Sequence, residues 1–480
     1  MYFKQFYDTD LAQGSYLIGC QATGEAVVVD PRRDVAVYLA DAAANGLRVT
    51  VVTETHIHAD YLSGARELAA ATGAALRLSA EGGPDWLYAF EHEPLRHGDV
   101  IDVGNVRLTA LHTPGHTPEH LSFLVTDRAR SDEPTMVLTG DFVFVGDLGR
   151  PDLLDEAAGY QDTRYEGARQ LFRSLKERFL TLPDHVQVWP GHGAGSACGK
   201  ALGAVASTTV GYERLTAWWA DHLANDDVEG FVAALLEGQP DAPSYFGRMK
   251  RQNRAGPALL GARAPLKEFT ADELRGRVNR DLVLVDTRTT REQWSASVPG
   301  ALAVPGGRSF ATYAAWVIDP EVERRPIVLL ASDAARAAAL RDRLTYVGID
   351  GVVGYLPSLE GLDTQPLPLV TPAELEALPG AHVLDVRTAS EHAAGHVPGS
   401  QQLHAGRVLQ RLAELPRGGT LVLHCQSGGR SLVVASALRN RGFGNVVELE
   451  GSYEAWRAHE RVRAAQGGGA ERAGTLVEGR

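Results

Sequence analysis

The stretch that decides the fold of the first half of the chain is His56-Ile57-His58-Ala59-Asp60-Tyr61. It follows the apolar run Val49-Thr50-Val51-Val52-Thr53, which predicts a buried strand. Because alternate side chains of an extended segment point the same way, His56, His58 and Asp60 can converge where that strand ends. Imidazole and carboxylate groups are ligands for zinc, iron or manganese, so the stretch predicts a metal site at a strand end.

Three later motifs place further ligand-type side chains beside glycine, each after a strand-like run. They are Thr113-Pro114-Gly115-His116, Leu138-Thr139-Gly140-Asp141 and Trp189-Pro190-Gly191-His192. Glycine in such corners lets the backbone turn and pass close to a ligand. The order of H-x-H-x-D, then His, Asp and His, resembles the metallo-β-lactamase superfamily over roughly residues 1–235. The resemblance implies an αββα sandwich with its metals at one edge of the two sheets.

Tyr61 is the position at which the sequence departs from that pattern. The binuclear members of the superfamily read H-x-H-x-D-H, and Tyr61 stands where the last His would be. A phenol, with a pKa of about 10, is a poor metal ligand at neutral pH. A two-zinc hydrolase is therefore disfavoured. His56, His116 and Asp141 remain as a two-His, one-carboxylate face, which is typical of non-haem Fe(II) oxygenases.

This departure makes the chain similar to the persulfide dioxygenase branch, and Gly146-Asp147-Leu148-Gly149-Arg150-Pro151-Asp152 strengthens the resemblance. The resemblance implies one Fe(II) per chain, bound by His56, His116 and Asp141. The other three ligand-type residues would orient those ligands and water; they are His58, Asp60 and His192. The implied substrates are O2 and a low-molecular-weight thiol persulfide, carried on glutathione, coenzyme A or a similar thiol, and the implied product is sulfite.

Length and composition indicate a large cytoplasmic protein. The 480 residues predict two or three domains, and 44% hydrophobic with 22% charged residues is ordinary for globular chains. The net charge of −13 gives no reason to expect a nucleic-acid partner. No apolar run is long enough to span a bilayer, and the first residues do not have the pattern of a secretory signal. We therefore expect no membrane partner, and three scattered cysteines exclude a disulfide framework.

The second half contains an internal duplication. Leu282-Val283-Leu284-Val285-Asp286-Thr287-Arg288 and Val383-Leu384-Asp385-Val386-Arg387 lie about a hundred residues apart, and each is followed by Val-Pro-Gly. Both copies resemble rhodanese domains, which are α/β folds with a mainly parallel sheet. The expected division of the chain is a metallo-β-lactamase-like dioxygenase domain (1–237), a basic linker (238–265), an inactive rhodanese-like domain (266–365), an active rhodanese domain (366–462) and a disordered tail (463–480).

The second chemical site is Cys425-Gln426-Ser427-Gly428-Gly429-Arg430, between a strand-like run and a helix-like run. A cysteine at a helix N-terminus is surrounded by backbone N–H groups, and with Arg430 these favour the thiolate. A thiolate can attack a sulfane sulfur and hold it as a persulfide. The C-x4-R loop is one residue shorter than the C-x5-R loop of cysteine phosphatases and is similar to that of sulfurtransferases. In the first copy Ala331 aligns with Cys425, so we expect that copy to be a structural or docking domain.

Cys198 has two readings. It lies six residues after His192 in a glycine-rich stretch that can approach the metal pocket. It is either a buried thiol or a sulfur-accepting thiol with catalytic function, whose pKa Lys200 would lower.

A basic cluster in the otherwise acidic chain also has two readings. It contains Arg248, Lys250 and Arg251. The cluster is either a solvated linker or an element that folds back over the metal domain and binds an anionic thiol carrier as a substrate-binding site.

The resulting hypothesis is a persulfide dioxygenase joined to a sulfurtransferase. Together the two activities would make thiosulfate from persulfide and sulfite, or would catalyse the reverse reaction. One alternative is a thioester hydrolase similar to glyoxalase II, which uses two metals. Another is a non-catalytic sulfur-carrier or docking protein with a structural metal site. We also expect a homo-oligomer of an order that the sequence does not define.

Overall fold

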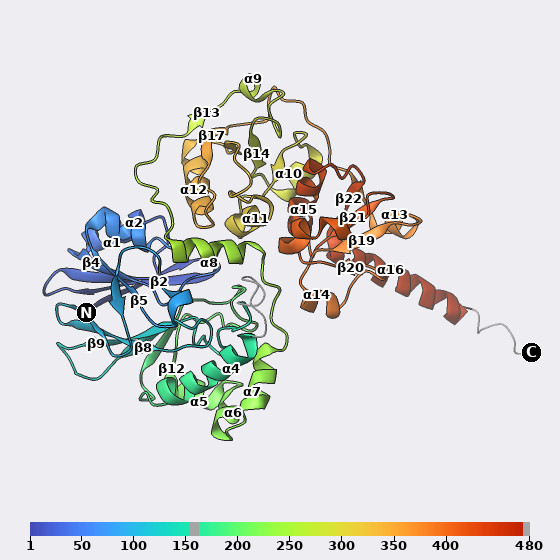
Figure 1. The fold of residues 1–480 in the computed structure, drawn as a ribbon. Helices are drawn as coiled ribbons and strands as arrows, with labels where there is room; N and C mark the ends of the chain where they lie inside the picture. Colours follow the sequence, from blue (N-terminus) through green and yellow to red (C-terminus); the bar gives the residue numbers. More distant parts are fainter. Residues whose placement is uncertain (154–162, 474–480) are drawn as a thin grey trace, which may run out of the picture. The chain divides into compact units, whose positions relative to one another are not determined.

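The computed structural model describes residues 1–153 and 163–473. The chain divides into two compact units (Figure 1). The first is Met1–Ala264 with Asp342–Asp350, and the second is Pro265–Arg341 with Gly351–Arg480. Within the described ranges, no helix combines the length and the apolar character that crossing a membrane requires.

The first unit is built on two six-stranded sheets. One has the order β1-β2-β3-β4-β5-β6 and the other β12-β11-β10-β9-β8-β7. The first sheet contains β1 (Tyr2–Asp8), β2 (Gln13–Cys20), β3 (Glu25–Val29), β4 (Arg48–Thr53), β5 (Ala75–Ser79) and β6 (Glu93–Leu95). The second contains β7 (Val100–Val103), β8 (Val106–His112), β9 (Leu121–Asp127), β10 (Met136–Gly140), β11 (Gln187–Pro190) and β12 (Thr208–Thr209).

Helices cover the outer face of each sheet, as Figure 1 shows for the first unit. They are α1 (Ala36–Ala44) and α2 (Ala65–Thr72) on one side, and α4 (Thr163–Ser174), η2 (Leu175–Phe179), α5 (Val210–Thr216), α6 (Ala220–Ala224) and α7 (Val228–Leu236) on the other. The unit also contains η1 (Pro84–Trp86) and α8 (Tyr245–Ala255). The apolar faces of the two sheets meet in one core, to which Ile18 and Val27 contribute from one side and Leu108 and Leu138 from the other. A second core joins β1–β5 to α1 and α2, and a third joins the other sheet to α4–α7. The expected αββα sandwich is confirmed.

Helix α8 belongs to the first unit and is not an open linker. Asn253 on this helix donates to the backbone oxygens of His58 (2.8 Å) and Tyr61 (2.7 Å). It also accepts from the N–H of Ser63 at 2.9 Å. These bonds tie α8 to the loop of the H-x-H-x-D-Y motif, which agrees with the second reading of the basic cluster, the element that folds back.

The second unit contains two five-stranded sheets with matching orders, β13-β17-β16-β14-β15 and β18-β22-β21-β19-β20. All their neighbouring strands are parallel. The first copy has β13 (Lys267–Glu268), α9 (Ala271–Leu274), β14 (Val283–Asp286), α10 (Thr290–Ser295), β15 (Leu302–Ala303), α11 (Phe310–Val317), β16 (Ile327–Leu330), α12 (Ala334–Thr345) and β17 (Val352–Leu356). The second has β18 (Leu369–Val370), α13 (Pro372–Glu376), β19 (His382–Asp385), α14 (Ala389–Ala393), β20 (Gln401–Gln402), η3 (Ala405–Gln410), η4 (Leu412–Glu414), β21 (Leu421–His424), α15 (Gly429–Asn440), β22 (Val446–Leu449) and α16 (Ser452–Ala473).

Helix starts repeat between the two copies at equivalent places. Thr289 and Glu292 form a reciprocal cap at the start of α10, and Thr388 and Glu391 do the same for α14. Such a box satisfies backbone N–H groups that the first helical turn leaves free. The shared caps and strand orders support the duplication that the sequence predicts.

The C-terminal segment is more ordered than its composition suggested. Helix α16 continues to Ala473, so residues 463–473 are helical and the expectation of disorder is wrong for them. Residues 474–480 of that expected tail lie outside the described part of the chain.

Glu448 predicts a pH-dependent stability for the second unit. It is fully buried on β22, 3.5 Å from Arg439 and 3.4 Å from the indole nitrogen of Trp294. Burial raises the pKa of Glu448 from 4.5 to about 7, although Arg439 opposes the shift. Between these two pH values the unfolded chain has released a proton that the folded chain keeps, so stability falls as pH rises.

Between pH 4.5 and 7 the free energy of unfolding should fall by roughly 3 kcal/mol because of Glu448. We expect Glu448→Gln to remove this part of the fall. The measurement is the free energy of urea unfolding at several pH values. The exposed neighbour Glu450 gives a matched control, Glu450→Gln. An unchanged pH slope in Glu448→Gln would show that this carboxyl is not the titrating group.

Candidate functional site

A group of three buried ligand-type side chains lies in the first unit. His56, His116 and Asp141 each offer one ligand atom, and these atoms lie within 4.8 Å of one another. Asp141 Oδ2 is 3.6 Å from His116 Nε2 and 4.0 Å from His56 Nε2. The three residues follow β4, β8 and β10, so strand ends of both sheets meet at one edge.

The polar atoms of this edge fit a metal ion. Among the described residues, both carboxylate oxygens of Asp141, Oδ2 of Asp60 and Nε2 of His192 are buried without a hydrogen-bond partner. Leaving buried acceptors unpaired is costly, whereas a cation would satisfy them together. The site therefore suggests a metal, as the sequence predicted.

Hydrogen bonds on the far side of each imidazole fix its orientation. His56 Nδ1 lies 3.0 Å from Thr55 Oγ1, and His116 Nδ1 lies 2.9 Å from the backbone oxygen of Arg150. His192 Nδ1 lies 3.0 Å from the backbone oxygen of Ala12. An imidazole that donates through Nδ1 presents the lone pair of Nε2, which is the form that binds a metal.

The two ligand imidazoles, His56 and His116, are held in the neutral form that binds a metal. Burial lowers the pKa of His56 well below its usual value, and the neighbouring imidazoles lower it further. Burial also lowers the pKa of His116 to about 4, although Asp141 opposes that shift. Both rings are neutral at pH 7 and available as ligands.

Two of the three outer residues form a second buried group. Asp60 and His192 join Cys198, with one ligand atom from each lying within 4.8 Å of the others. His192 Nε2 is 3.4 Å from Asp60 Oδ2 and 3.6 Å from Asp141 Oδ1, so the two groups are adjacent. His58 points elsewhere, because its Nε2 lies 3.1 Å from Asp30 Oδ1.

Tyr61 does not contribute to either group. It is fully buried, and its hydroxyl donates to the backbone oxygen of Asp30 at 3.1 Å. Gln13 Nε2 donates to the same hydroxyl at 3.2 Å. Burial raises the pKa of Tyr61 well above its ordinary value, so the phenol stays neutral. The position of a second-site His is thus occupied by a packing residue.

Cys198 is a buried thiol, the first of its two sequence-based interpretations, and is 2% exposed. Lys200 does not activate it, because the Lys200 ammonium donates to the backbone oxygens of Ala234 and Glu237. Burial raises the pKa of Cys198 well above its usual value, and Asp141 and Asp60 raise it further. Its nearness to the metal group is the part of the expectation that the structure supports.

Two further residues, which the sequence motifs do not include, hold the backbone of the site in place. His120 Nε2 accepts the backbone N–H of Asp141 at 3.2 Å. Asp30 accepts from the backbone and hydroxyl of Thr55 at 2.7 and 2.9 Å. Asp30 ends an apolar strand-like run much as Asp141 does, and that shared pattern was the available signal.

Helix α8 brings one of the three basic candidates close to the metal edge. Lys250 Nζ lies 3.8 Å from the ring centre of Trp86, and the ammonium interacts electrostatically with Glu119. Burial lowers the pKa of Lys250, while Glu119 opposes that shift. Arg248 is buried and donates to the backbone oxygen of Val347, so it is not available as the open substrate-binding residue that was expected.

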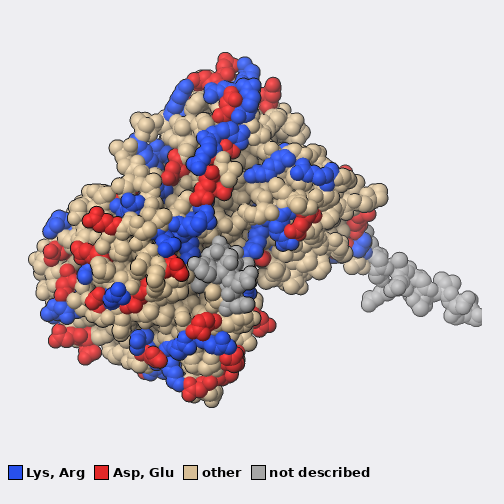
Figure 2. All heavy atoms as spheres, viewed as in Figure 1, with Lys and Arg blue, Asp and Glu red and all other residues tan. Residues whose placement is uncertain are grey.

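Arg251 of the basic cluster lies on the surface. It is exposed, as is Arg254 one turn later. Figure 2 shows basic side chains gathered where Figure 1 places α8.

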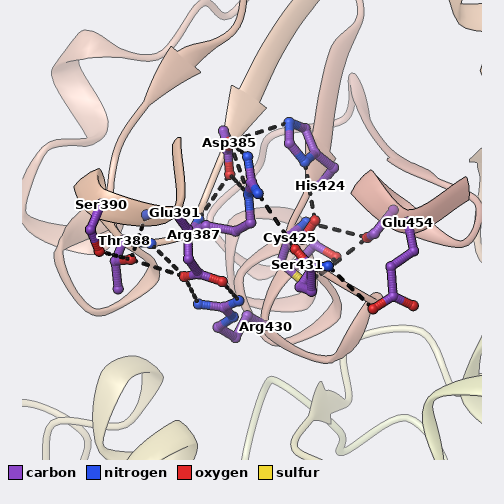
Figure 3. A network of polar contacts seen from close by, with 12 residues as sticks. Asp385, Arg387, Thr388, Ser390, Glu391, His424, Cys425, Arg430, Ser431 and Glu454 are labelled. Atoms are coloured by element: carbon purple, nitrogen blue, oxygen red, sulfur yellow. Dashed lines mark hydrogen bonds and ion pairs between the residues drawn. The ribbon is translucent and has the colours of Figure 1, made fainter. Parts of the chain in front are cut away.

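The second site surrounds Cys425, between β21 and α15 (Figure 3). Its Sγ accepts the backbone N–H of Gly428 at 3.1 Å, and the Ser431 hydroxyl donates to it at 3.7 Å. The Ser452 hydroxyl lies 3.9 Å from Sγ and accepts the N–H of Cys425. A sulfur that faces several hydrogen-bond donors at a strand end is well placed to act as a nucleophile.

Arg430 is held beside this loop by Glu391. Each of its two terminal nitrogens donates to one carboxylate oxygen at 2.7 Å (Figure 3). Burial raises the pKa of Glu391, but the bonds from Arg430 and from the Thr388 backbone outweigh it, and the pKa is lowered to about 2. The guanidinium of Arg430 therefore forms an ion pair with Glu391. It also interacts electrostatically with Cys425.

The first copy lacks this chemistry. Ala331 follows β16 as Cys425 follows β21. Arg336 donates to the backbone oxygen of Gly306 and its N–H is bound by Asp333, a residue inside the loop. The side chain at this position is a methyl group, so the loop itself supplies no thiol.

Comparison with known proteins agrees with this architecture. The family model of the metallo-beta-lactamase superfamily matches residues 8–192, and that of the rhodanese-like domain matches residues 371–459. A hydroxyacylglutathione hydrolase of Nitrosococcus oceani is 31% identical over 224 residues, which are 46% of this chain and 76% of that protein. The chain belongs to the metallo-β-lactamase superfamily. It also carries a rhodanese-like domain at its C-terminal end.

The chain is also similar to other members of the superfamily. A metallo-beta-lactamase of Staphylococcus aureus has a crystal structure with 38% identity and a TM-score of 0.67, covering 74% of this chain and 99% of that one. The mitochondrial persulfide dioxygenase ETHE1 of Bos taurus is 27% identical over 39% of this chain and 67% of that protein. A hydroxyacylglutathione hydrolase of Polaromonas sp. is matched over 61% of its own length. Membership of the superfamily is thus compatible with more than one reaction.

Proposed function

We propose that the first unit is an iron persulfide dioxygenase and that the C-terminal rhodanese-like domain is a sulfurtransferase working through Cys425. The overall oxidation converts a thiol persulfide, O2 and water to the free thiol and sulfite. The observation that carries the first half is Tyr61, whose hydroxyl is turned to the Asp30 backbone. It leaves a compact group of two His and one carboxylate, which suits Fe(II) with open positions.

His56, His116 and Asp141 would hold the Fe(II), which when bound supplies the place where O2 and the terminal sulfur of the persulfide meet. Thr55 and the Arg150 backbone keep the two imidazoles in the ligand form. His120 holds the backbone of Asp141 and so its carboxylate. Because His56, His116, Asp141 and His120 are all buried, bulk water is excluded from the place where the iron would bind.

Lys250 is the basic residue that we propose for binding the anionic thiol carrier. The side chain of Lys250 is partly exposed and lies beside Trp86. Its positive charge contributes to lowering the pKa of His116. Arg251 offers a second cation on the exposed side of the same helix. Glutathione and coenzyme A both carry carboxylate or phosphate groups that such cations can pair with.

The second candidate function is thioester hydrolysis with two metals. The observation that favours it is the adjacent group of Asp60, His192 and Cys198, which offers ligand atoms for a second ion. The hydroxyacylglutathione hydrolase relatives support the same reading. Parallel assays of O2 uptake with a glutathione persulfide and of hydrolysis with a glutathione thioester separate the two. We expect O2 uptake to dominate, and efficient hydrolysis without O2 uptake would reverse the assignment.

Cys198 is expected to influence which product leaves the first unit. It shares a buried group with Asp60 and His192 beside the metal ligands, so sulfur that reaches the pocket can pass to it. Because its raised pKa keeps the thiol protonated, we expect a small persulfide to label Cys198 more slowly than Cys425, as read by mass spectrometry. Cys198→Ser should change the ratio of sulfite to thiosulfate about twofold or more. Cys20, a buried cysteine of the same unit, gives the control Cys20→Ser. An unlabelled Cys198 with an unchanged product ratio would make it a packing residue.

A further inference from the structure

The Cys425 thiol lies in a small cup formed by residues 425–430, between the end of β21 and the first turn of α15. Its Sγ accepts the N–H of Gly428 at 3.1 Å, and the residue is only 2% exposed. Arg430 ends this loop and interacts electrostatically with the thiol. A sulfur donor must therefore bring its outer sulfur into the cup close to the Arg430 guanidinium.

The contact between Arg430 and Glu391 has the geometry of oxyanion binding. The two terminal nitrogens of Arg430 donate side by side to the two oxygens of Glu391, at 2.7 Å each (Figure 3). A guanidinium binds carboxylates and phosphates in this bidentate way. Both side chains are partly exposed, so an incoming anion can reach the pair. Glu391 thus occupies the fork of Arg430 that an oxyanion substrate would use.

Further bonds hold the Glu391 carboxylate in place. Its Oε2 also accepts from the backbone N–H and the hydroxyl of Thr388, at 3.0 Å each. These two donors belong to the cap at the start of α14 and meet Arg430 at the same oxygen. An anion that competes for Arg430 therefore meets a carboxylate that is fixed and, with a pKa lowered to about 2, charged at neutral pH.

In the first copy, which lacks the cysteine, the equivalent residues have different partners. Glu292 forms the same kind of cap with Thr289, but Arg336 donates to the backbone oxygen of Gly306. Within the described ranges, the cap is thus present in both copies and the bidentate pair only in the copy with the nucleophile. The cap alone does not account for the pair, which points to a function in the chemistry of the cysteine.

We propose that Glu391 is a specificity-determining residue of the sulfurtransferase site, which occupies Arg430 and so favours an alkyl persulfide over thiosulfate as the sulfur donor. The proposal rests on the sulfurtransferase function of Cys425. Thiosulfate must either displace the fixed carboxylate from Arg430 or bind beside its negative charge, and both lower its affinity. The protonated end of an alkyl persulfide brings no charge to the cup.

Both donors transfer sulfur to Cys425 without any other reagent. With an alkyl persulfide, RS–SH, the Cys425 thiolate attacks the outer sulfur, the S–S bond breaks, and RS⁻ leaves with the electron pair. The outer sulfur keeps its proton and becomes the end of a Cys425 persulfide. With thiosulfate the same attack expels sulfite, so three oxygens and their negative charge must be accommodated near Arg430 and Glu391 from the start.

Glu391→Gln tests this selection. Glutamine can still close the cap on Thr388, but it carries no charge and leaves the fork of Arg430 open to another anion. With a dithiol as acceptor, we expect the KM for thiosulfate to fall about tenfold, the effect of about one hydrogen bond to a charged group. The kcat/KM for an uncharged alkyl persulfide should change less than twofold. Damage to the fold would slow both reactions, so a gain with one donor separates selection from a structural role.

A second variant and a control complete the test. The ratio of the two kcat/KM values does not depend on the fraction of folded protein, and Glu391→Ala should raise the same ratio in favour of thiosulfate. Adding Arg430→Met to Glu391→Gln should abolish the gain, because the gain needs the freed guanidinium. Glu414→Gln is the control, since Glu414 forms a similar pair with Arg411 in the same domain, and it should leave both reactions unchanged.

An unchanged or higher KM for thiosulfate in Glu391→Gln, or an equal change with both donors, would overturn the proposal. A gain that survives in the double variant without Arg430 would overturn it as well. If the unaltered protein transferred sulfur from neither donor, the function of Cys425 itself would be wrong, and that result is distinct from a loss of selection.

Discussion

His56→Ala and Asp141→Ala are each expected to abolish iron binding and O2 uptake. Each removes one of three converging ligand atoms. Two protein ligands rarely retain a divalent metal through purification, and loss of even an outer partner typically costs 10–100-fold in affinity or activity. We therefore expect less than about one tenth of an iron per chain, and an oxidation rate reduced at least about 100-fold. Metal analysis and an oxygen electrode give both numbers from the same samples.

Matched controls make this result specific. His222→Ala and Asp184→Ala change the same residue types in the same unit, at surface positions that pair with Asp227 and Arg214. Both should keep the iron and the activity of the unaltered protein. Circular dichroism would verify that His56→Ala remains folded. Full iron occupancy in His56→Ala or Asp141→Ala would mean that these residues are not ligands.

Cys425→Ser is expected to eliminate sulfurtransferase activity while the iron site stays occupied. A serine hydroxyl fits the cup and can accept the Gly428 N–H, but it cannot carry a sulfane sulfur as a persulfide. Removing a covalent nucleophile costs several orders of magnitude, so thiosulfate-dependent transfer should fall about 10³-fold or more. O2 uptake with a persulfide substrate should change little, because Cys425 and the metal group belong to different compact units.

The corresponding change in the first copy provides the control for this loss. Ala331→Ser alters the loop that aligns with the cysteine loop and should leave both activities intact. Sulfurtransferase activity that survives in Cys425→Ser would identify another thiol as the carrier, and a Cys198→Ser, Cys425→Ser double variant would then locate it.

The sequence was most informative where chemistry follows a local pattern. Strand alternation predicted that His56 would face a metal pocket, and the Gly-Asp corner predicted the same for Asp141. Both lie in one buried group in the structure. The C-x4-R loop likewise predicted a cysteine at a strand end before a helix, as observed at Cys425.

Properties that depend on distant contacts could not be predicted from a single sequence. The basic composition around Arg248 resembles a solvated segment, yet its partners are about a hundred or more residues away in the chain, such as Val347. Local charge suggested that Lys200 would activate Cys198, but burial decides the state of that thiol. Trp294 reaches Gly428 from another domain, and nothing near either residue indicates the contact.

The most direct test of the account is iron content together with O2 consumption on a panel of thiol persulfides. The account predicts about one iron per chain, bound by His56, His116 and Asp141. It also predicts one O2 consumed for each persulfide oxidised, with sulfite as the product. About two zinc ions per chain, with thioester hydrolysis and no persulfide-dependent O2 uptake, would contradict it.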